Sequence, residues 1–90
     1  MIELRAIVRG RVQLVMFRDF TRRTARKLGI TGSVFNCPDG AVEIVAQGER
    51  GALETLLKKL HQGSLLSRVD SVESEWHEPV KRFGDFNIIY

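Results

Sequence analysis

The feature that most constrains the fold is the order in which two kinds of apolar periodicity follow one another along the chain. Alternation of apolar and polar residues indicates a half-buried strand, and a repeat of three to four residues indicates an amphipathic helix. The segments that read as strands are residues 2–9, 31–36, 41–47, 69–77 and 86–90. Those that read as helices are residues 18–28 and 49–62. The chain is therefore expected to follow the order β-α-β-β-α-β, with a short final strand.

This order is typical of an α+β sandwich of the ferredoxin-like type, with two helices on one face of a mostly antiparallel four- to five-stranded sheet. Residues 1–90 suffice for one domain. No apolar run approaches the length that crosses a membrane, and the first residues lack a signal-peptide pattern. The single cysteine, Cys37, excludes an internal disulfide framework, so we expect a cytoplasmic protein.

The segment that joins the first strand to the first helix is the candidate functional site. A strand–loop–helix junction presents unpaired backbone N–H groups and the positive end of the helix dipole in one place. Such a junction binds anions, most often phosphate. Arg18 stands at the helix entrance, and its planar guanidinium suits a phosphoryl group better than a lysine ammonium does. The alternative is a surface arginine that pairs with a neighbouring acid.

Positive charge gathers around this junction. Eight basic and two acidic residues lie in positions 1–27, whereas six basic and nine acidic residues follow them. A positive potential attracts anions, although a solvated basic helix face gives the same pattern. RNA-binding modules share the expected order of elements, but they need aromatic residues on the sheet, and the chain has no K/R-G-F/Y-G/A-F-V-x-F/Y string. We therefore expect no nucleic-acid partner.

Two blocks of sequence resemble the signatures of the acylphosphatase family. The first is Gly10-Arg11-Val12-Gln13 followed by Phe17-Arg18, which is similar to G-x-V-Q-G-V-x-F-R. The second runs from Leu28 to Asn36 and continues with Asp39-Gly40, which is similar to L-G-[LI]-x-G-x-V-x-N-x-x-D-G. The spacing between the blocks agrees with the family, and the resemblance extends over residues 2–90. One position departs from it: Leu14 stands where the family has glycine.

The resemblance implies an acylphosphatase that hydrolyses acyl phosphates to carboxylate and inorganic phosphate, without cofactor or metal. It implies that Arg18 binds the substrate phosphate and that Asn36 positions the attacking water. The expected phosphate-binding loop consists of Arg11, Val12, Gln13, Leu14, Val15, Met16 and Phe17. Without the motif, Asn36 reads as a turn residue that bonds to its own backbone. We expect a monomer that acts on a small molecule and does not bind membranes.

Leu14 leaves two interpretations open. If the loop requires a positive φ there, a residue other than glycine introduces strain of order 1–3 kcal/mol or reshapes the loop. Reshaping would give a catalytically weak protein that binds phosphate or another anion, or serves as an interaction module. Alternatively, Leu14 finds an allowed conformation and its side chain covers nearby apolar surface.

The remaining candidates for chemistry are weaker. His61 and His77 have no partners that would complete a metal set, and Cys37 lies in no nucleophile motif. Glu73 and Glu75 share one face of a strand with no second element to enclose them, so we expect them to be solvated. The glycine-rich motifs of nucleotide-binding enzymes are missing.

Overall fold

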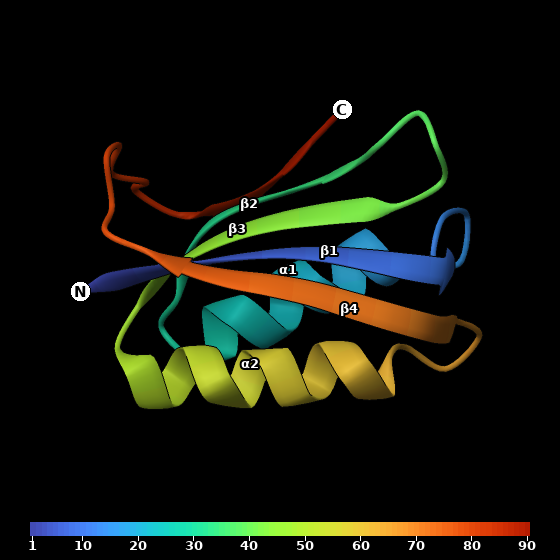
Figure 1. Cartoon of the computed structure of the whole chain (residues 1–90), viewed down its shortest axis with the longest axis horizontal. Coiled ribbons are helices and arrows are strands. Elements are labelled where there is room, and N and C mark those ends of the chain that lie inside the picture. Colours follow the sequence, from blue (N-terminus) through green and yellow to red (C-terminus); the bar gives the residue numbers. More distant parts are fainter.

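The structure, a computed structural model, describes residues 1–90 and contains one five-stranded sheet with two helices (Figure 1). The strands are β1 (Ile2–Arg11), β2 (Thr31–Asn36), β3 (Val42–Gly48), β4 (Arg68–His77) and β5 (Phe86–Ile89). The helices are α1 (Phe17–Lys27) and α2 (Arg50–Gln62). The predicted order of elements and the α+β sandwich of the ferredoxin-like type are confirmed, and the ends of the elements shift by two residues at most.

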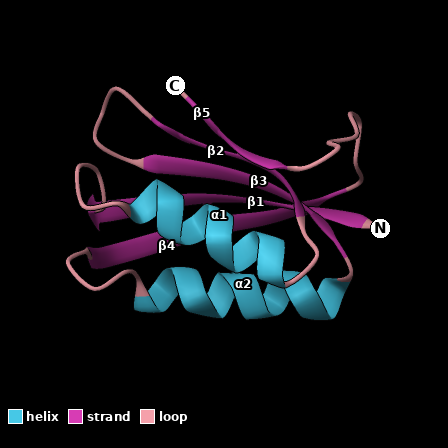
Figure 2. Ribbon diagram, turned by 180° about the vertical axis from the view of Figure 1, so that it is seen from behind, coloured by secondary structure: helices cyan, strands magenta, loops and turns pink.

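The strands are arranged in the order β4-β1-β3-β2-β5, so that β3 lies at the centre of the sheet and β1 lies between β4 and β3. All neighbouring pairs are antiparallel except β2 and β5, which run parallel. Both helices cover the same face, and the connections β1–α1, α2–β4 and β2–β3 gather at one end of the sheet (Figure 2). Neither helix is long and apolar enough to span a bilayer.

The core lies between the helices and the covered face of the sheet. Its sheet side consists of the inward-facing positions of the strands, as the alternation predicts: Leu4, Ala6, Val8, Val34, Val42, Ile44, Ala46 and Phe86. Its helix side consists of positions at helical spacing: Phe17, Ala25, Leu53, Leu56 and Leu60. Burial of these apolar side chains is the main favourable contribution to folding. It also fixes the two ends of the candidate loop.

Glu3 departs from the alternation, because it occupies a polar position of the first strand and yet is only 2% exposed. The Nε2 of Gln47 donates hydrogen bonds to Glu3 Oε1 at 2.9 Å and to the carbonyl of Lys81. The Nε of Arg5 donates to Glu3 Oε2 at 2.7 Å. The connection between β4 and β5 therefore covers this part of the otherwise open face. Alternation within a strand carries no information about a cover formed by a distant segment.

Gly10 allows β1 to approach β4 closely just before the candidate loop. Its φ is 132°, and a Cβ built there would lie 2.1 Å from the carbonyl oxygen of Arg68. The β1–β4 register shifts between Arg9 and Gly10, which marks a β-bulge. The first glycine of the motif thus has a structural requirement, because a side chain at this position would collide with the backbone of β4.

Candidate active site

The loop between β1 and α1 is held at both ends by buried side chains. Val12 and Phe17 are each 1% exposed and belong to the core. Between them, Leu14 and Met16 adopt positive φ values of 62° and 60°. These values lie in the small left-handed region that residues other than glycine rarely occupy. The loop therefore turns sharply between two fixed points.

The backbone of this loop presents unpaired donors. Residues 12–16 donate no backbone hydrogen bond within the protein, and the first bond of α1 runs from Phe20 N–H to the carbonyl of Met16 at 3.0 Å. Met16 is the N-cap residue of α1, and no side chain caps the helix. The N–H groups of the first turn thus have no partner within the helix, and the positive end of its dipole adds to their field. This geometry binds anions.

Arg18 differs from the other arginines of α1. Arg22 and Arg23 both pair with Asp19, and Arg26 pairs with Asp85. Arg18 has no carboxylate partner, and its guanidinium carbon lies 5.0 Å from the centroid of the Tyr90 ring. A ring face orients a guanidinium without neutralising its charge. The alternative of a surface arginine paired with a neighbouring acid is therefore wrong.

Gln13 ties the loop to the hairpin of β2 and β3. Its Nε2 donates hydrogen bonds of 2.9 Å to the carbonyls of both Cys37 and Ala41. Cys37 directly follows Asn36 in the chain, so these two bonds hold the end of β2 against the loop. The two sequence blocks therefore lie next to each other in the fold, although Arg18 and Asn36 are 18 positions apart in the chain.

Asn36 ends β2 with an unsatisfied side chain. Its Oδ1 is buried and has no hydrogen-bond partner within the protein. The alternative of a turn-forming asparagine bonded to its own backbone is therefore wrong. Buried polar atoms are nearly always paired, so an unpaired acceptor of this kind calls for a functional explanation.

Asp39, rather than Asn36, stabilises the turn of this hairpin. Its Oδ1 accepts a hydrogen bond of 3.1 Å from the Ala41 N–H, and Arg9 Nη1 donates to its Oδ2 at 2.9 Å. The hydrogen bond from the Arg9 guanidinium holds the pKa of Asp39 below its ordinary value. The turn, with Gly40 at a φ of 95°, thus keeps the end of β2 in a fixed position.

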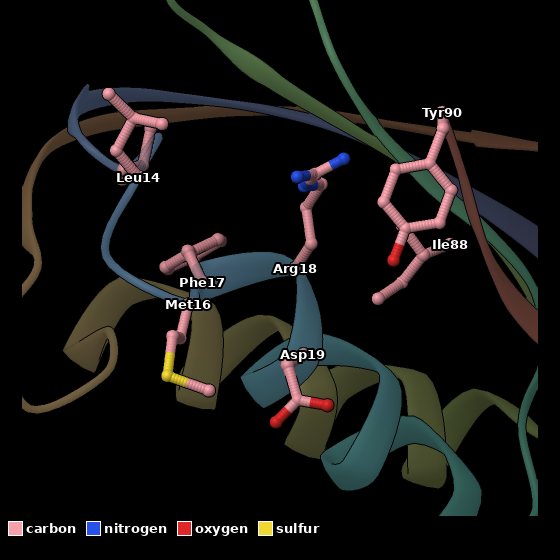
Figure 3. Close-up of a pocket in the computed structure, with 8 residues that line it drawn as sticks. Leu14, Met16, Phe17, Arg18, Asp19, Ile88 and Tyr90 are labelled. Atoms are coloured by element: carbon pink, nitrogen blue, oxygen red, sulfur yellow. The ribbon is translucent and has the colours of Figure 1, made fainter.

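A pocket of about 300 Å³ lies where the loop, α1 and β5 meet (Figure 3). Its lining consists of Val12, Leu14, Met16, Phe17, Arg18, Asp19, Ile88 and Tyr90. Figure 3 shows Leu14 to one side of the Arg18 guanidinium and Tyr90 to the other. An arginine without an acidic partner, placed in a small pocket beside free backbone donors, can bind a compact anion such as a phosphoryl group.

Comparisons with known proteins agree with this geometry. The family model for acylphosphatase matches residues 4–88. The chain belongs to the acylphosphatase family. It is 49% identical to the acylphosphatase of Thermus thermophilus over 87% of this chain and 89% of that protein. It is 48% identical to that of Mycolicibacterium vanbaalenii over 94% of this chain and 91% of that protein.

The fold agrees equally well with a solved structure of the family. The crystal structure of acylphosphatase from Bacillus subtilis superposes with a TM-score of 0.96 over the whole of both chains, at 37% identity. The family and the coverage identify this acylphosphatase as an enzyme that hydrolyses acyl phosphates. The predicted resemblance is thereby confirmed.

The remaining loop residues of this acylphosphatase contribute in different ways. Arg11 is the exposed last residue of β1 and lies opposite Arg68 in the β1–β4 register. Val15 packs against the core, and its carbonyl lies 3.5 Å from Ser64 Oγ. Leu14 has the positive φ of the first interpretation, but its side chain is 100% exposed. The interpretation in which this leucine covers apolar surface is therefore wrong.

Glu73, Glu75 and Cys37 do not line the pocket that contains Arg18. Glu73 and Glu75 are exposed, as predicted, and pair with Arg9 and His77 respectively. No group of three or more histidine, cysteine, aspartate or glutamate side chains is arranged to hold a metal ion. Burial raises the pKa of the Cys37 thiol, which disfavours the nucleophilic thiolate.

Sequence reasoning missed Tyr90 as a neighbour of Arg18 and missed the two bonds of the Gln13 side chain. Tyr90 reads as one more apolar position of a short strand. Its place beside α1 follows from the parallel pairing of β5 with β2, which sets Gly32 opposite Phe86. No local pattern encodes that pairing.

Proposed function

We propose that this acylphosphatase holds the phosphoryl group of its substrate with Arg18 and the loop N–H groups, and orients the attacking water with Asn36. One observation carries the proposal: Arg18 alone among the arginines of α1 has no acidic partner, and it lies beside a run of unpaired backbone donors. The buried, unpaired Oδ1 of Asn36 supports the second role.

The reaction asks for positioning and charge stabilisation more than for acid–base chemistry. An acyl phosphate is a mixed anhydride whose leaving group is a stable carboxylate. Phosphoryl transfer depends mainly on in-line geometry and on stabilisation of the negative charge of the oxygens. Arg18 and the backbone N–H groups supply positive charge and fixed dipoles to those oxygens.

Asn36 has the chemistry to direct a water without activating it. A carboxamide can accept a hydrogen bond from water through Oδ1 and donate another to a phosphoryl oxygen through Nδ2. Water and phosphorus are then aligned as the new P–O bond forms and the bond to the carboxylate oxygen breaks. The products are a carboxylate and inorganic phosphate. The bonds from Gln13 keep Asn36 in register with the loop.

The test is hydrolysis of benzoyl phosphate in the presence of a metal chelator. We expect turnover by the wild-type protein and a fall in kcat/KM of at least about 10²–10³, or about 2.7–4 kcal/mol, in Arg18→Ala and in Asn36→Ala. Lys27→Ala serves as control, because Lys27 is an exposed cation on the same helix and lies outside the pocket.

Thermal unfolding of each variant establishes that it is folded. Rates near wild type in Arg18→Ala or Asn36→Ala would remove the corresponding role. A folded wild-type protein that binds inorganic phosphate without turning over benzoyl phosphate would favour the alternative, a catalytically weak anion-binding protein.

A further inference from the structure

The side chain of Leu14 contributes nothing to the stability of the fold. It is 100% exposed, and its backbone adopts a φ of 62° that glycine would adopt without strain. Leu14, Met16 and Tyr90 are all exposed and line the same pocket as Arg18. Exposed apolar surface gathered beside polar groups marks ligand-binding sites. Leu14 is therefore placed to contact the acyl part of the substrate rather than its phosphoryl group.

The pocket offers apolar surface around a single free cation. Six of its eight lining residues are hydrophobic, but Val12 and Phe17 are each only 1% exposed. The apolar surface that a ligand could cover comes from Leu14, Met16, Ile88 and Tyr90, and Leu14 and Tyr90 lie on either side of Arg18 (Figure 3). Tyr90 is 94% exposed, so its ring also has surface to lose on binding. The other charged residue of the lining is Asp19, which is engaged by Arg22 and Arg23.

We propose that Leu14 and Tyr90 select acyl phosphates whose acyl group is compact, apolar and uncharged, such as an aryl or branched alkyl group. This inference rests on the proposed function, because it assigns Arg18 to the phosphoryl group. The acyl group would contact the exposed Leu14 side chain and the exposed edge of the Tyr90 ring while Arg18 and the loop hold the phosphate.

Two physical effects produce the selectivity. Each methylene that leaves water on binding raises affinity roughly fourfold, so that a larger apolar acyl group gains over acetyl. A free carboxylate on the acyl group would lose its hydration against the apolar side chains, and no free cation of the pocket would receive it, because Arg18 is assigned to the phosphoryl group. Dicarboxylic acyl phosphates are therefore disfavoured.

The experiment compares kcat/KM for benzoyl, acetyl and succinyl phosphate, each divided by the uncatalysed hydrolysis rate. The variant is Leu14→Asn, because asparagine has a similar size, is polar and tolerates the left-handed region. Leu65→Asn is the matched control, since Leu65 is 96% exposed and lies outside the pocket lining.

We expect the wild-type protein to favour benzoyl over acetyl phosphate by at least about tenfold, and acetyl over succinyl phosphate. Leu14→Asn should lower the benzoyl-to-acetyl ratio by at least about fivefold, whereas Leu65→Asn should leave this ratio and the rates unchanged. The ratio of the two kcat/KM values is the readout, because a general disturbance of the loop would lower kcat/KM for both substrates alike.

Equal preference in the wild-type protein, or an unchanged ratio in Leu14→Asn, would overturn the selectivity proposal. The proposed function would survive that outcome if acetyl phosphate is still hydrolysed and Arg18→Ala abolishes its hydrolysis. Failure of the wild-type protein to hydrolyse any of the three substrates would overturn both proposals.

Discussion

The polar side chains near the two ends of β1 differ in how completely they are hydrogen-bonded. At its start, Glu3 and Gln47 are buried and their polar atoms are paired with one another and with neighbouring groups. Beyond its end, Arg18 has no acidic partner, and Asn36 keeps a buried acceptor unpaired. The polar cluster around Glu3 is thus hydrogen-bonded within the protein, whereas Arg18 and Asn36, at the other end of β1, have polar groups without partners.

From this contrast we infer that the region around Glu3 serves stability and that the region around Arg18 serves binding. An unpaired buried polar group costs free energy, and such groups persist where a ligand completes them. Substitutions near Glu3 should therefore change the free energy of unfolding, and substitutions around Arg18 should change activity. The following predictions test that division.

The largest expected effect on stability belongs to Gln47→Leu. This substitution removes the amide donor from the buried Glu3 carboxylate and from the Lys81 carbonyl. We expect the free energy of unfolding to fall by about 3 kcal/mol in urea denaturation, with kcat/KM per folded molecule unchanged. Gln62→Leu, the same change at an exposed position of α2, should stay within about 0.5 kcal/mol of wild type. Equal losses in both variants would contradict this assignment.

Gln13→Met should lower both stability and activity, because Gln13 connects the loop to the β2–β3 hairpin. Methionine keeps the length of the side chain but removes both hydrogen bonds to the β2–β3 turn. We expect a loss of about 1–2 kcal/mol in unfolding free energy. Because Asn36 loses its register with the loop, kcat/KM for benzoyl phosphate should fall about tenfold. A loss of stability without a loss of activity would show that the β2–β3 turn keeps its position without the hydrogen bonds from Gln13.

Acidification should weaken the paired cluster around Glu3. Burial alone raises the pKa of Glu3, but hydrogen bonds from Gln47 and Arg5 more than offset this effect, and the pKa lies below its ordinary value. The resulting stabilisation is fully present above the pKa of the unfolded chain. It is lost as the pH falls through the lower pKa of the folded state. Urea denaturation between pH 3 and 7 should therefore show a steeper acid decline for wild type than for Glu3→Gln. Parallel curves would disprove the linkage.

Leu14→Gly should have the smallest effect. The backbone already adopts the positive φ that glycine favours, so the relief of strain is offset by the greater freedom of glycine in the unfolded chain. We expect the unfolding free energy to change by less than about 1 kcal/mol, and the affinity for inorganic phosphate to stay within about twofold. Tighter phosphate binding, measured by calorimetry, would show that the leucine distorts the loop.

The architecture could be predicted from sequence because each strand and helix has its own periodicity. The alternation of Leu4, Ala6 and Val8 and the spacing of Leu53, Leu56 and Leu60 both match the buried faces. The two sequence blocks located the loop and the end of β2. These signals are local, and they depend on side-chain direction within a single element.

The parts that could not be predicted all depend on pairing between distant segments. Glu3 is buried because Lys81 and its neighbours fold over it, and Arg18 finds Tyr90 because β5 pairs in parallel with β2. The two acceptors of Gln13 likewise belong to a turn that follows in the next hairpin. Such partners are determined by the register of the whole sheet, and the residues next to them in the sequence show no pattern that predicts them.

The position of β1 between two later strands also governs when the proposed site can form. Its two neighbours are β3, which starts at Val42, and β4, which starts at Arg68, so neither side of the strand is paired until much of the chain has folded. Mixed domains with such non-local strand pairing fold more slowly than helical bundles, because the long intervening segments must be closed first. The loop that follows β1 therefore gains its fixed starting point only in the step that closes the sheet, and we expect a partly folded chain to lack the proposed phosphate site.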